Sequence, residues 1–196
     1  MTLKPLKRVI FLVTGNIHKF NEARNVLSEF DLSTAMLNID TVEIQADSIE
    51  EIAKTSAVDA AKKCCLPIIV EDAGLFIDAL NGFPGPYSSH VFRTLGTEGI
   101  LKLMKDTKRR NAHFESAIAF YSPELKSPES FHGKTEGKIT EQTRGLEGFG
   151  FDPIFLPPQG QGKTFAEMPL TEKNRYSHRA KALRGFAEWY VSTFRI

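Results

Sequence analysis

Short apolar runs and segments of helical periodicity alternate along the first part of the chain. Residues 8–13 (RVIFLV) and 68–70 (IIV) are rich in β-branched side chains, which is typical of strands buried on both faces of a parallel sheet. Residues 35–44 (AMLNIDTVEI) predict another strand with an extension, and the segment from Lys19 to near Phe30 predicts an amphipathic helix. This alternation of strands and helices is typical of an α/β protein.

A second helix is predicted after Ser48, which forms a capping-box pattern with Glu51 three residues later. Its apolar face is formed by residues at helical spacing: Ile49, Ile52, Ala53, Ala57, Ala60 and Cys64. We therefore interpret Cys64 as a small buried hydrophobe. Lys54 lies on the flank of this face, where it either reaches a cleft or is solvated.

The pattern changes after Asn111. Residues 112–121 and 131–140 alternate partly between apolar and polar positions and are joined by a polar turn, so they predict a long antiparallel hairpin. Towards the end of the chain, Ser177 is the predicted N-cap of a long helix. The buried stripe of that helix is predicted to comprise Ala180, Leu183, Ala187, Tyr190 and Phe194.

We expect residues 1–196 to form a single domain with two lobes. One lobe is predicted to comprise about residues 1–105 together with the last helix, about 177–196. The second lobe, about 110–165, is predicted to contain the hairpin.

The composition is that of an ordinary soluble globular protein. The chain has 196 residues, 41% of them hydrophobic, and its net charge of +1 gives no argument for a nucleic acid or a membrane as partner. The longest apolar runs are about six residues, whereas ~20 are needed to span a bilayer. The basic segment Met1–Arg8 is not followed by the apolar core of a signal peptide. The neighbouring cysteines Cys64 and Cys65 are poorly placed for a structural disulfide, which favours a reduced, cytoplasmic setting.

Two adjacent carboxylates, Glu71 and Asp72, directly follow the apolar run 68–70. We expect the strand to end there, and ligands of open α/β sheets bind outside the carboxyl ends of the strands. One hypothesis is that Asp72 holds a divalent cation or a water molecule. The alternative is that both carboxylates are solvated where a strand meets a turn.

The turn Thr14-Gly15-Asn16, between the first strand and the first helix, is a candidate phosphate site. The free backbone N–H groups and the positive dipole end of a helix favour an anion there, and Lys19 adds a full positive charge. The alternative is an ordinary turn in which Asn16 caps the helix.

His178 and Arg179 occupy the first turn of the last helix, where the helix dipole disfavours positive charge by several tenths of a kcal/mol. Basic residues in this position indicate either a functional site or a carboxylate partner elsewhere in the fold.

Together, these positions describe a site for a ligand with a metal-bridged polyphosphate and an aromatic base. Glu43, Glu71 and Asp72 offer hard oxygen ligands of the kind that Mg²⁺ accepts. Phe149 and Phe151 offer a stacking surface. The other polar candidates are Asp152, Lys173, His178 and Arg179.

Four blocks of the sequence resemble the inosine triphosphate pyrophosphatase family, whose members remove non-standard purine nucleoside triphosphates. The blocks are Thr14-Gly15-Asn16 with Lys19, residues 70–87 (VEDAGLFIDALNGFPGPY), residues 148–155 (GFGFDPIF) and residues 164–179 (TFAEMPLTEKNRYSHR). The resemblance implies an α/β fold with an elongated mixed β-sheet, flanking helices and two lobes around a central cleft. It also implies a homodimer.

The resemblance further implies hydrolysis between the α and β phosphates of ITP, XTP and dITP, which gives the monophosphate and pyrophosphate. Asp72 would align or deprotonate the attacking water, and Glu43 and Asp72 would bind Mg²⁺, with Glu71 as a further candidate. The residues implied to hold the triphosphate are Thr14, Gly15, Asn16, Lys19 and Lys54. Those implied to contact the base are Phe149, Gly150, Phe151, Asp152, Lys173, His178 and Arg179.

Two positions of the implied substrate site depart from the family pattern. Ala73 stands where serine is often found, and Phe151 stands where tyrosine or tryptophan is common. Two other interpretations stay open: a related Maf-type pyrophosphatase that acts on pyrimidine or modified nucleotides, and a nucleotide-binding module without turnover. The Ser177-His178-Arg179 block follows the inosine-type pattern, and the retained carboxylates favour an enzyme over a binding module.

Overall fold

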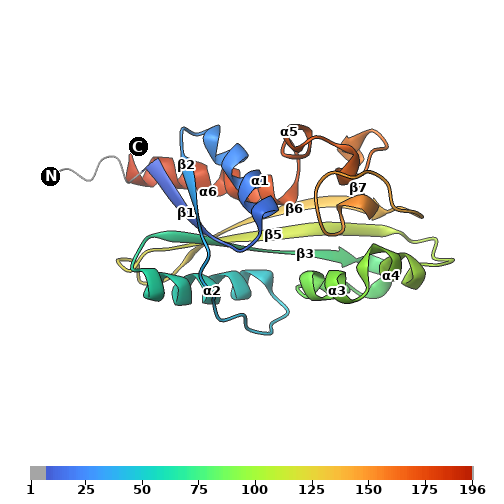
Figure 1. Cartoon of the computed structure of the whole chain (residues 1–196), viewed down its shortest axis with the longest axis horizontal. Helices are drawn as coiled ribbons and strands as arrows, with labels where there is room; N and C mark the ends of the chain where they lie inside the picture. Colours follow the sequence, from blue (N-terminus) through green and yellow to red (C-terminus); the bar gives the residue numbers. More distant parts are fainter. Residues whose placement is uncertain (1–7, 196) are drawn as a thin grey trace.

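The computed structural model describes residues 8–195, which form an elongated molecule built on a long sheet (Figure 1). The strands are β1 (Val9–Val13), β2 (Ser33–Leu37), β3 (Ile68–Ile77), β4 (Pro84–Gly85), β5 (Asn111–Tyr121), β6 (Glu129–Ile139) and β7 (Phe155–Leu156). The helices are α1 (Ile17–Ser28), α2 (Ile49–Cys64), α3 (Ser88–Thr94), α4 (Gly96–Leu103), α5 (Leu170–Lys173) and α6 (His178–Phe194). None of the described helices is long and apolar enough to cross a membrane.

The sheet is mixed, and its described strands are arranged in the order β2-β1-β3-β5-β6-β7, with β4 paired to β3. β1 lies parallel to both β2 and β3, whereas β3, β5, β6 and β7 pair in antiparallel fashion. β5 accompanies β3 over its full length, from the pair Ile68↔Tyr121 to the pair Ile77↔Ala112. The mixed sheet and the long β5–β6 hairpin therefore confirm the predicted fold class.

Helices cover both faces of one end of the sheet (Figure 1). α1 and α6 pack on one face through a buried cluster that includes Val26, Leu183 and Phe186. On the opposite face, α2 presents Ala53, Ala57 and Ala60 to the strands, which is the apolar face predicted from helical spacing. A third cluster, at the other end, joins the end of β3 to α3, α4 and β7. Side chains on the two faces of β3 therefore enter separate clusters.

The structure corrects two predicted strand boundaries. β2 ends at Leu37 rather than Ile44, and the residues that follow lack regular structure up to the start of α2. The backbone of Val42 bonds to side chains of α2 instead of a neighbouring strand. β3 does not end at the carboxylates but continues to Ile77, because β5 supplies hydrogen-bond partners along its whole length.

Several smaller predictions can be compared with the structure directly. Ser48 and Ser177 are the N-caps of α2 and α6, as predicted. Cys64 is only half-buried, because it lies in the last turn of α2. The basic segment before Arg8 lies outside the described residues. The division into two lobes stays a prediction.

Candidate active site

Glu71 and Asp72 lie in the middle of β3, directly past the residues that pair with β1. The parallel pairing ends at Val13↔Val70, so both carboxylates stand beyond the carboxyl end of β1. This is the edge at which ligands of parallel sheets are expected, although β3 itself continues. Because successive strand residues face opposite sides, the two carboxylates have different surroundings.

The β1–α1 turn is stiffened by its own side chains. The Asn16 side chain caps α1, accepting hydrogen bonds from the backbone N–H groups of His18 at 2.9 Å and Lys19 at 3.2 Å. The hydroxyl of Thr14 accepts a hydrogen bond from the Asn16 N–H at 3.1 Å. The capped-turn interpretation is therefore correct, and it is compatible with an anion site because the turn also lines a cavity.

Two adjoining cavities, of about 570 Å³ and about 740 Å³, meet at the carboxylate edge of the sheet. Their shared wall consists of Thr14, Gly15, Lys19, Glu43, Asp72, Pro86, Ser89 and Arg93. The first cavity continues towards Phe149 and His178, and the second continues along the loop after β2 towards α2. After the parts of the ligand that the sequence leads us to expect in them, we call them the base cavity and the phosphate cavity. A further hollow at the far end of the hairpin contains no predicted site residue.

Asp72 is the unsatisfied charge of this wall. Its Oδ2 atom is buried and has no hydrogen-bond partner among the described residues. Burial raises the pKa of Asp72 to about 6, and the negative charges of Glu71 and Glu43 act in the same direction, against the opposing charge of Lys19. A carboxylate held in this way is ready to bind a cation or to accept a proton.

We expect the Asp72→Asn variant to be more stable than the wild type in metal-free buffer. The pKa of Asp72 rises from 3.8 to about 6 on folding, so its ionisation opposes folding. The penalty is absent below about pH 4, develops as the pH rises to about 6 and stays constant above that, reaching at most about 3 kcal/mol. Urea unfolding in EDTA at several pH values measures it. A difference between the two proteins that does not vary with pH would contradict the shifted pKa.

Glu71 is held by an internal network of charges rather than left free for a ligand. Its carboxylate contacts Lys19 Nζ at 2.8 Å and Arg179 Nε at 3.0 Å, and it accepts a hydrogen bond from Ser116 at 2.6 Å. Burial opposes the ionisation of Glu71, but the charges of Arg179 and Lys19 outweigh it and lower the pKa to about 2. The structure therefore favours Asp72 over Glu71 as a ligand for a metal.

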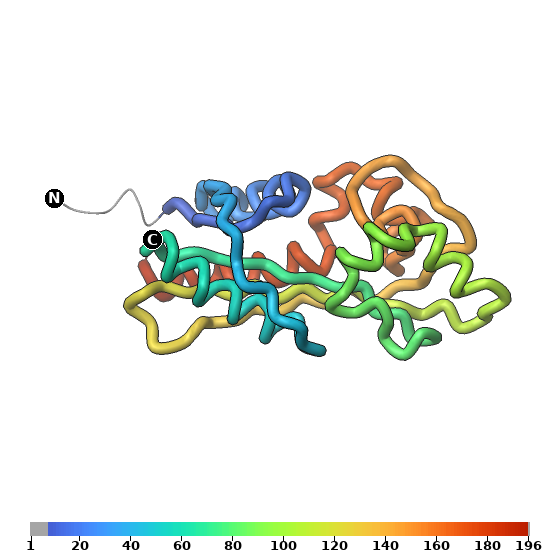
Figure 2. The backbone as a smooth tube through the Cα atoms, turned by 60° about the horizontal axis from the view of Figure 1, so that its bottom comes forward, coloured from blue at the N-terminus to red at the C-terminus, as the bar shows by residue number. Residues whose placement is uncertain are grey.

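The network continues from Glu71 as an alternating chain of buried bases and acids. Arg179 Nη1 contacts Glu22 Oε2 at 2.6 Å, Lys173 Nζ contacts Glu22 Oε1 at 2.7 Å, and Lys173 Nζ also contacts Asp152 Oδ2 at 2.6 Å. Figure 2 shows the start of α1 in blue beside the orange-red segment that leads into α6, and the bond between Lys173 and Glu22 joins these two segments. The basic first turn of α6 thus has carboxylate partners, which is one of the two alternatives that its sequence allowed.

The base cavity is lined by aromatic rings. Phe149 stacks on His18, with ring centroids 5.3 Å apart, and Lys173 and Arg179 lie over its ring at 5.2 and 5.3 Å. The largely buried ring of Phe151 instead packs edge-on against Phe92, as part of the core cluster at that end.

His178 is buried at the back of the base cavity and stacks on Phe114, with ring centroids 4.5 Å apart. Burial, followed by the charges of Arg179 and Lys173, lowers its pKa well below 6.5, so the imidazole is neutral. Its Nδ1 atom has no hydrogen-bond partner among the described residues.

The structure brings together most, but not all, of the predicted site residues. Those that line the cavities are Thr14, Gly15, Asn16, Lys19, Glu43, Glu71, Asp72, Ala73, Phe149, Gly150, Phe151, Asp152, His178 and Arg179. Lys173 lies behind the wall, where it contacts Asp152. Lys54 lines neither cavity; it is half-exposed and pairs with Glu50 at 2.5 Å on the surface of α2.

Sequence reasoning missed several residues of the site, and Glu22, Arg93 and His18 are the charged or titratable ones that the argument uses. Glu22 is buried among Lys173 and Arg179, although as a glutamate on an amphipathic helix it resembles a solvated residue. Arg93 and His18 line the cavities from α3 and α1. None of these three residues stands in a recognisable sequence pattern.

The residues at the shared wall fit a divalent metal that is completed by its substrate. Within residues 8–195, no three His, Cys, Asp or Glu side chains are grouped so that they could hold a metal ion by themselves. However, Mg²⁺ is commonly bound by one or two carboxylates together with substrate phosphates. Asp72, with its partnerless Oδ2, and Glu43 on the same wall meet that requirement.

Comparison with known proteins places the chain in a family. The model of the Ham1 family matches residues 10–189. A dITP/XTP pyrophosphatase of Methanopyrus kandleri is 49% identical over 181 residues, which are 92% of this chain and 95% of that protein. The corresponding protein of Pyrococcus horikoshii is 46% identical over 180 residues, which are 92% of this chain and 95% of that protein.

Solved structures agree with the sequence relatives. A HAM1 protein from Coxiella burnetii, 31% identical, superposes with a TM-score of 0.82 over 94% of this chain and 98% of that one. The Staphylococcus aureus Ham1 protein, 27% identical, superposes with a TM-score of 0.79 over 94% of this chain and 99% of that one. On both sequence and fold, the chain belongs to the Ham1 family.

Proposed function

We propose that this protein is a nucleoside triphosphate pyrophosphohydrolase that converts ITP, dITP and XTP to their monophosphates and pyrophosphate. The observation that carries the proposal is the buried, partnerless Oδ2 of Asp72 on the wall shared by a base cavity and a phosphate cavity. Relatives that match over nearly their whole length carry the name dITP/XTP pyrophosphatase, which supports the same substrates.

The phosphate end of the substrate would lie at the shared wall. Lys19, Arg93 and the positive dipole end of α1 supply the positive charge that a triphosphate requires. Asp72 and Glu43 would hold Mg²⁺, which neutralises phosphate charge and lowers the pKa of a bound water. Asp72 would align the attacking water and accept its proton.

The purine end would lie in the base cavity. Phe149 offers an aromatic face, and Arg179 and the neutral His178 offer hydrogen-bonding groups for the base edge. A 6-oxo group accepts hydrogen bonds where the 6-amino group of adenine donates them, so donors at this position select hypoxanthine and xanthine. Guanine shares the 6-oxo group, and its rejection must therefore depend on the 2-position.

Release of pyrophosphate from a panel of nucleotides tests the proposal. With Mg²⁺ present, we expect turnover of ITP, dITP and XTP to exceed that of ATP, GTP, UTP and dTTP. We also expect EDTA to remove the activity and excess Mg²⁺ to restore it. A preference for pyrimidine nucleotides would instead indicate the Maf-type enzyme, and binding of ITP without turnover would indicate a binding module. Full activity in EDTA would contradict the metal assignment.

We further propose that the enzyme works as a homodimer, as the family resemblance implies, and that it works in the cytoplasm, which the two neighbouring free cysteines favour. Light scattering coupled to size-exclusion chromatography measures the oligomeric state directly.

A further inference from the structure

The loop that carries Glu43 is fastened to α2 by its backbone. The loop has no regular structure from the end of β2 to the start of α2. At its centre, the Val42 N–H donates a hydrogen bond to Asp59 Oδ2 at 2.9 Å, and the Val42 carbonyl accepts one from Ser56 Oγ at 3.1 Å. Val42 is the residue next to Glu43, so both bonds act one residue away from the proposed metal ligand.

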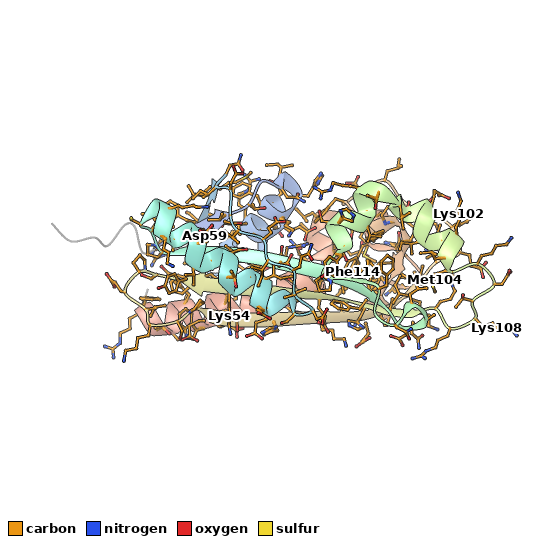
Figure 3. The ribbon with its side chains drawn as sticks, turned by 90° about the horizontal axis from the view of Figure 1, so that it is seen from below. Lys54, Asp59, Lys102, Met104, Lys108 and Phe114 are labelled. Carbon is orange, nitrogen blue, oxygen red and sulfur yellow. The ribbon has the colours of Figure 1, made fainter. Side chains whose placement is uncertain are left out.

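A third side chain of α2 extends this attachment. Lys63 Nζ donates to the carbonyl of Asp40 at 2.7 Å and pairs with Asp59 Oδ2 at 2.8 Å. Ser56, Asp59 and Lys63 are spaced i, i+3 and i+7, which places them on one side of the helix. We call these three residues the α2 clamp. In Figure 3, Asp59 is labelled on the side of α2 next to the blue N-terminal segment, and Lys54 on the other side.

Apolar packing holds the loop at its start, where Ile39 lies against the cluster beneath α2, but not next to Glu43. The side chain of Val42 is 52% exposed, so burial of this residue does not hold the loop in place. The pairing of β2 with β1 ends at Leu37, so no strand pairing holds Glu43. Glu43 and Asp72 nevertheless both line the wall shared by the two cavities. The α2 clamp therefore supplies the side-chain hydrogen bonds that hold the loop nearest to Glu43.

We propose that Ser56, Asp59 and Lys63 are positioning residues that hold Glu43 beside Asp72 and so tune the affinity of the site for its divalent cation. This inference rests on the proposed function, because it assigns Glu43 to the metal. It gives α2 a second role besides covering the sheet: its alanine face packs in the core, while its clamp side sets the geometry of the metal site.

Variants of Asp59 separate positioning from general stabilisation. In Asp59→Ala, the Mg²⁺ concentration for half-maximal ITP hydrolysis should rise about tenfold, which is the usual scale for a lost outer-shell partner of a metal ligand. Turnover at saturating Mg²⁺ should stay close to that of the wild type. In Asp59→Asn, the amide oxygen can still accept from the Val42 N–H, so the Mg²⁺ requirement should stay near the wild-type value. Lys62→Ala, on the exposed side of the same helix, is the control.

A second readout does not depend on activity. In the metal-free protein, hydrogen exchange of a peptide covering residues 40–45 should be faster in Asp59→Ala than in the wild type, with Asp59→Asn close to the wild type. Ser56→Ala removes the other bond to Val42 with a minimal change in volume, and it should show the same direction of effect if Asp59→Ala is too unstable to study.

The outcomes distinguish this inference from the function on which it rests. If the wild type hydrolyses ITP with Mg²⁺ and Asp59→Ala has an unchanged Mg²⁺ requirement, the clamp proposal fails and the function stands. An Asp59→Asn variant as impaired as Asp59→Ala would overturn the role given to the bond from the Val42 N–H, because that variant loses only the charge pair with Lys63. Without ITP hydrolysis by the wild type, the function fails, while hydrogen exchange still tests the clamp.

Discussion

Replacing Asp72 with asparagine is expected to lower the turnover of ITP about 10²-fold or more, the scale of a lost general base. The asparagine keeps the shape of the side chain but can neither accept the proton of the attacking water nor bind a cation with a full charge. Binding of ITP should remain measurable, because the α1 N-terminus and the base cavity are unchanged. Steady-state pyrophosphate release and calorimetric titration with ITP measure the two quantities.

Asp40→Asn is the matched control for this experiment. Asp40 also lines the phosphate cavity, but it is exposed and lies outside the shared wall, so its loss should leave turnover close to the wild-type value. Unchanged turnover in Asp72→Asn would remove Asp72 from the proposed role. Because the same variant is expected to be the more stable protein above pH 6, lower activity cannot be attributed to unfolding. A gain in stability with a loss of activity is the signature of a residue kept for function.

Features that depend on neighbouring residues in the sequence were predictable. Ser48, Asn16 and Ser177 act as helix caps because a cap is defined within three residues, and the hairpin follows from local alternation. The extent of β3 was not predictable, because the partner that prolongs it is β5, which lies some forty residues further along the chain. The irregular loop after β2 was misjudged for the same reason, since α2 takes the bonds that a strand would need.

The same distinction between local and distant residues applies to the chemistry of the site. The sequence indicated Asp72 as a cation or water site, and the structure adds why the carboxylate is reactive: its Oδ2 atom is buried and has no hydrogen-bond partner among the described residues. The local sequence could not show that the neighbouring Glu71 forms ion pairs with Lys19 and Arg179, because Arg179 comes from the far end of the chain. Two adjacent carboxylates therefore have opposite pKa shifts, one raised to about 6 and one lowered to about 2.

Glu22→Gln is expected to destabilise the protein by about 3–5 kcal/mol, because breaking a buried ion pair leaves its partners uncompensated. Glu22 is 3% exposed and lies between Lys173 and Arg179. Burial opposes its ionisation, but these two cations outweigh it and lower the pKa of Glu22. Glutamine preserves the volume and removes the charge, so chemical denaturation at pH 7 reports the electrostatic contribution.

Glu29→Gln provides the comparison, because Glu29 follows α1 and also pairs with a residue of α6. Its contact with Arg184, at 2.9 Å, is exposed, and an exposed pair contributes less than about 1 kcal/mol. If both variants lost the same small free energy of unfolding, the buried chain of charges would contribute no more to stability than the exposed pair.

The double variant Glu22→Gln/Lys173→Met removes an acid and a base together, and its loss of unfolding free energy should be smaller than the sum of the losses in the two single variants. An additive result would mean that Glu22 and Lys173 do not depend on each other, and it would contradict their assignment to one buried chain of charges.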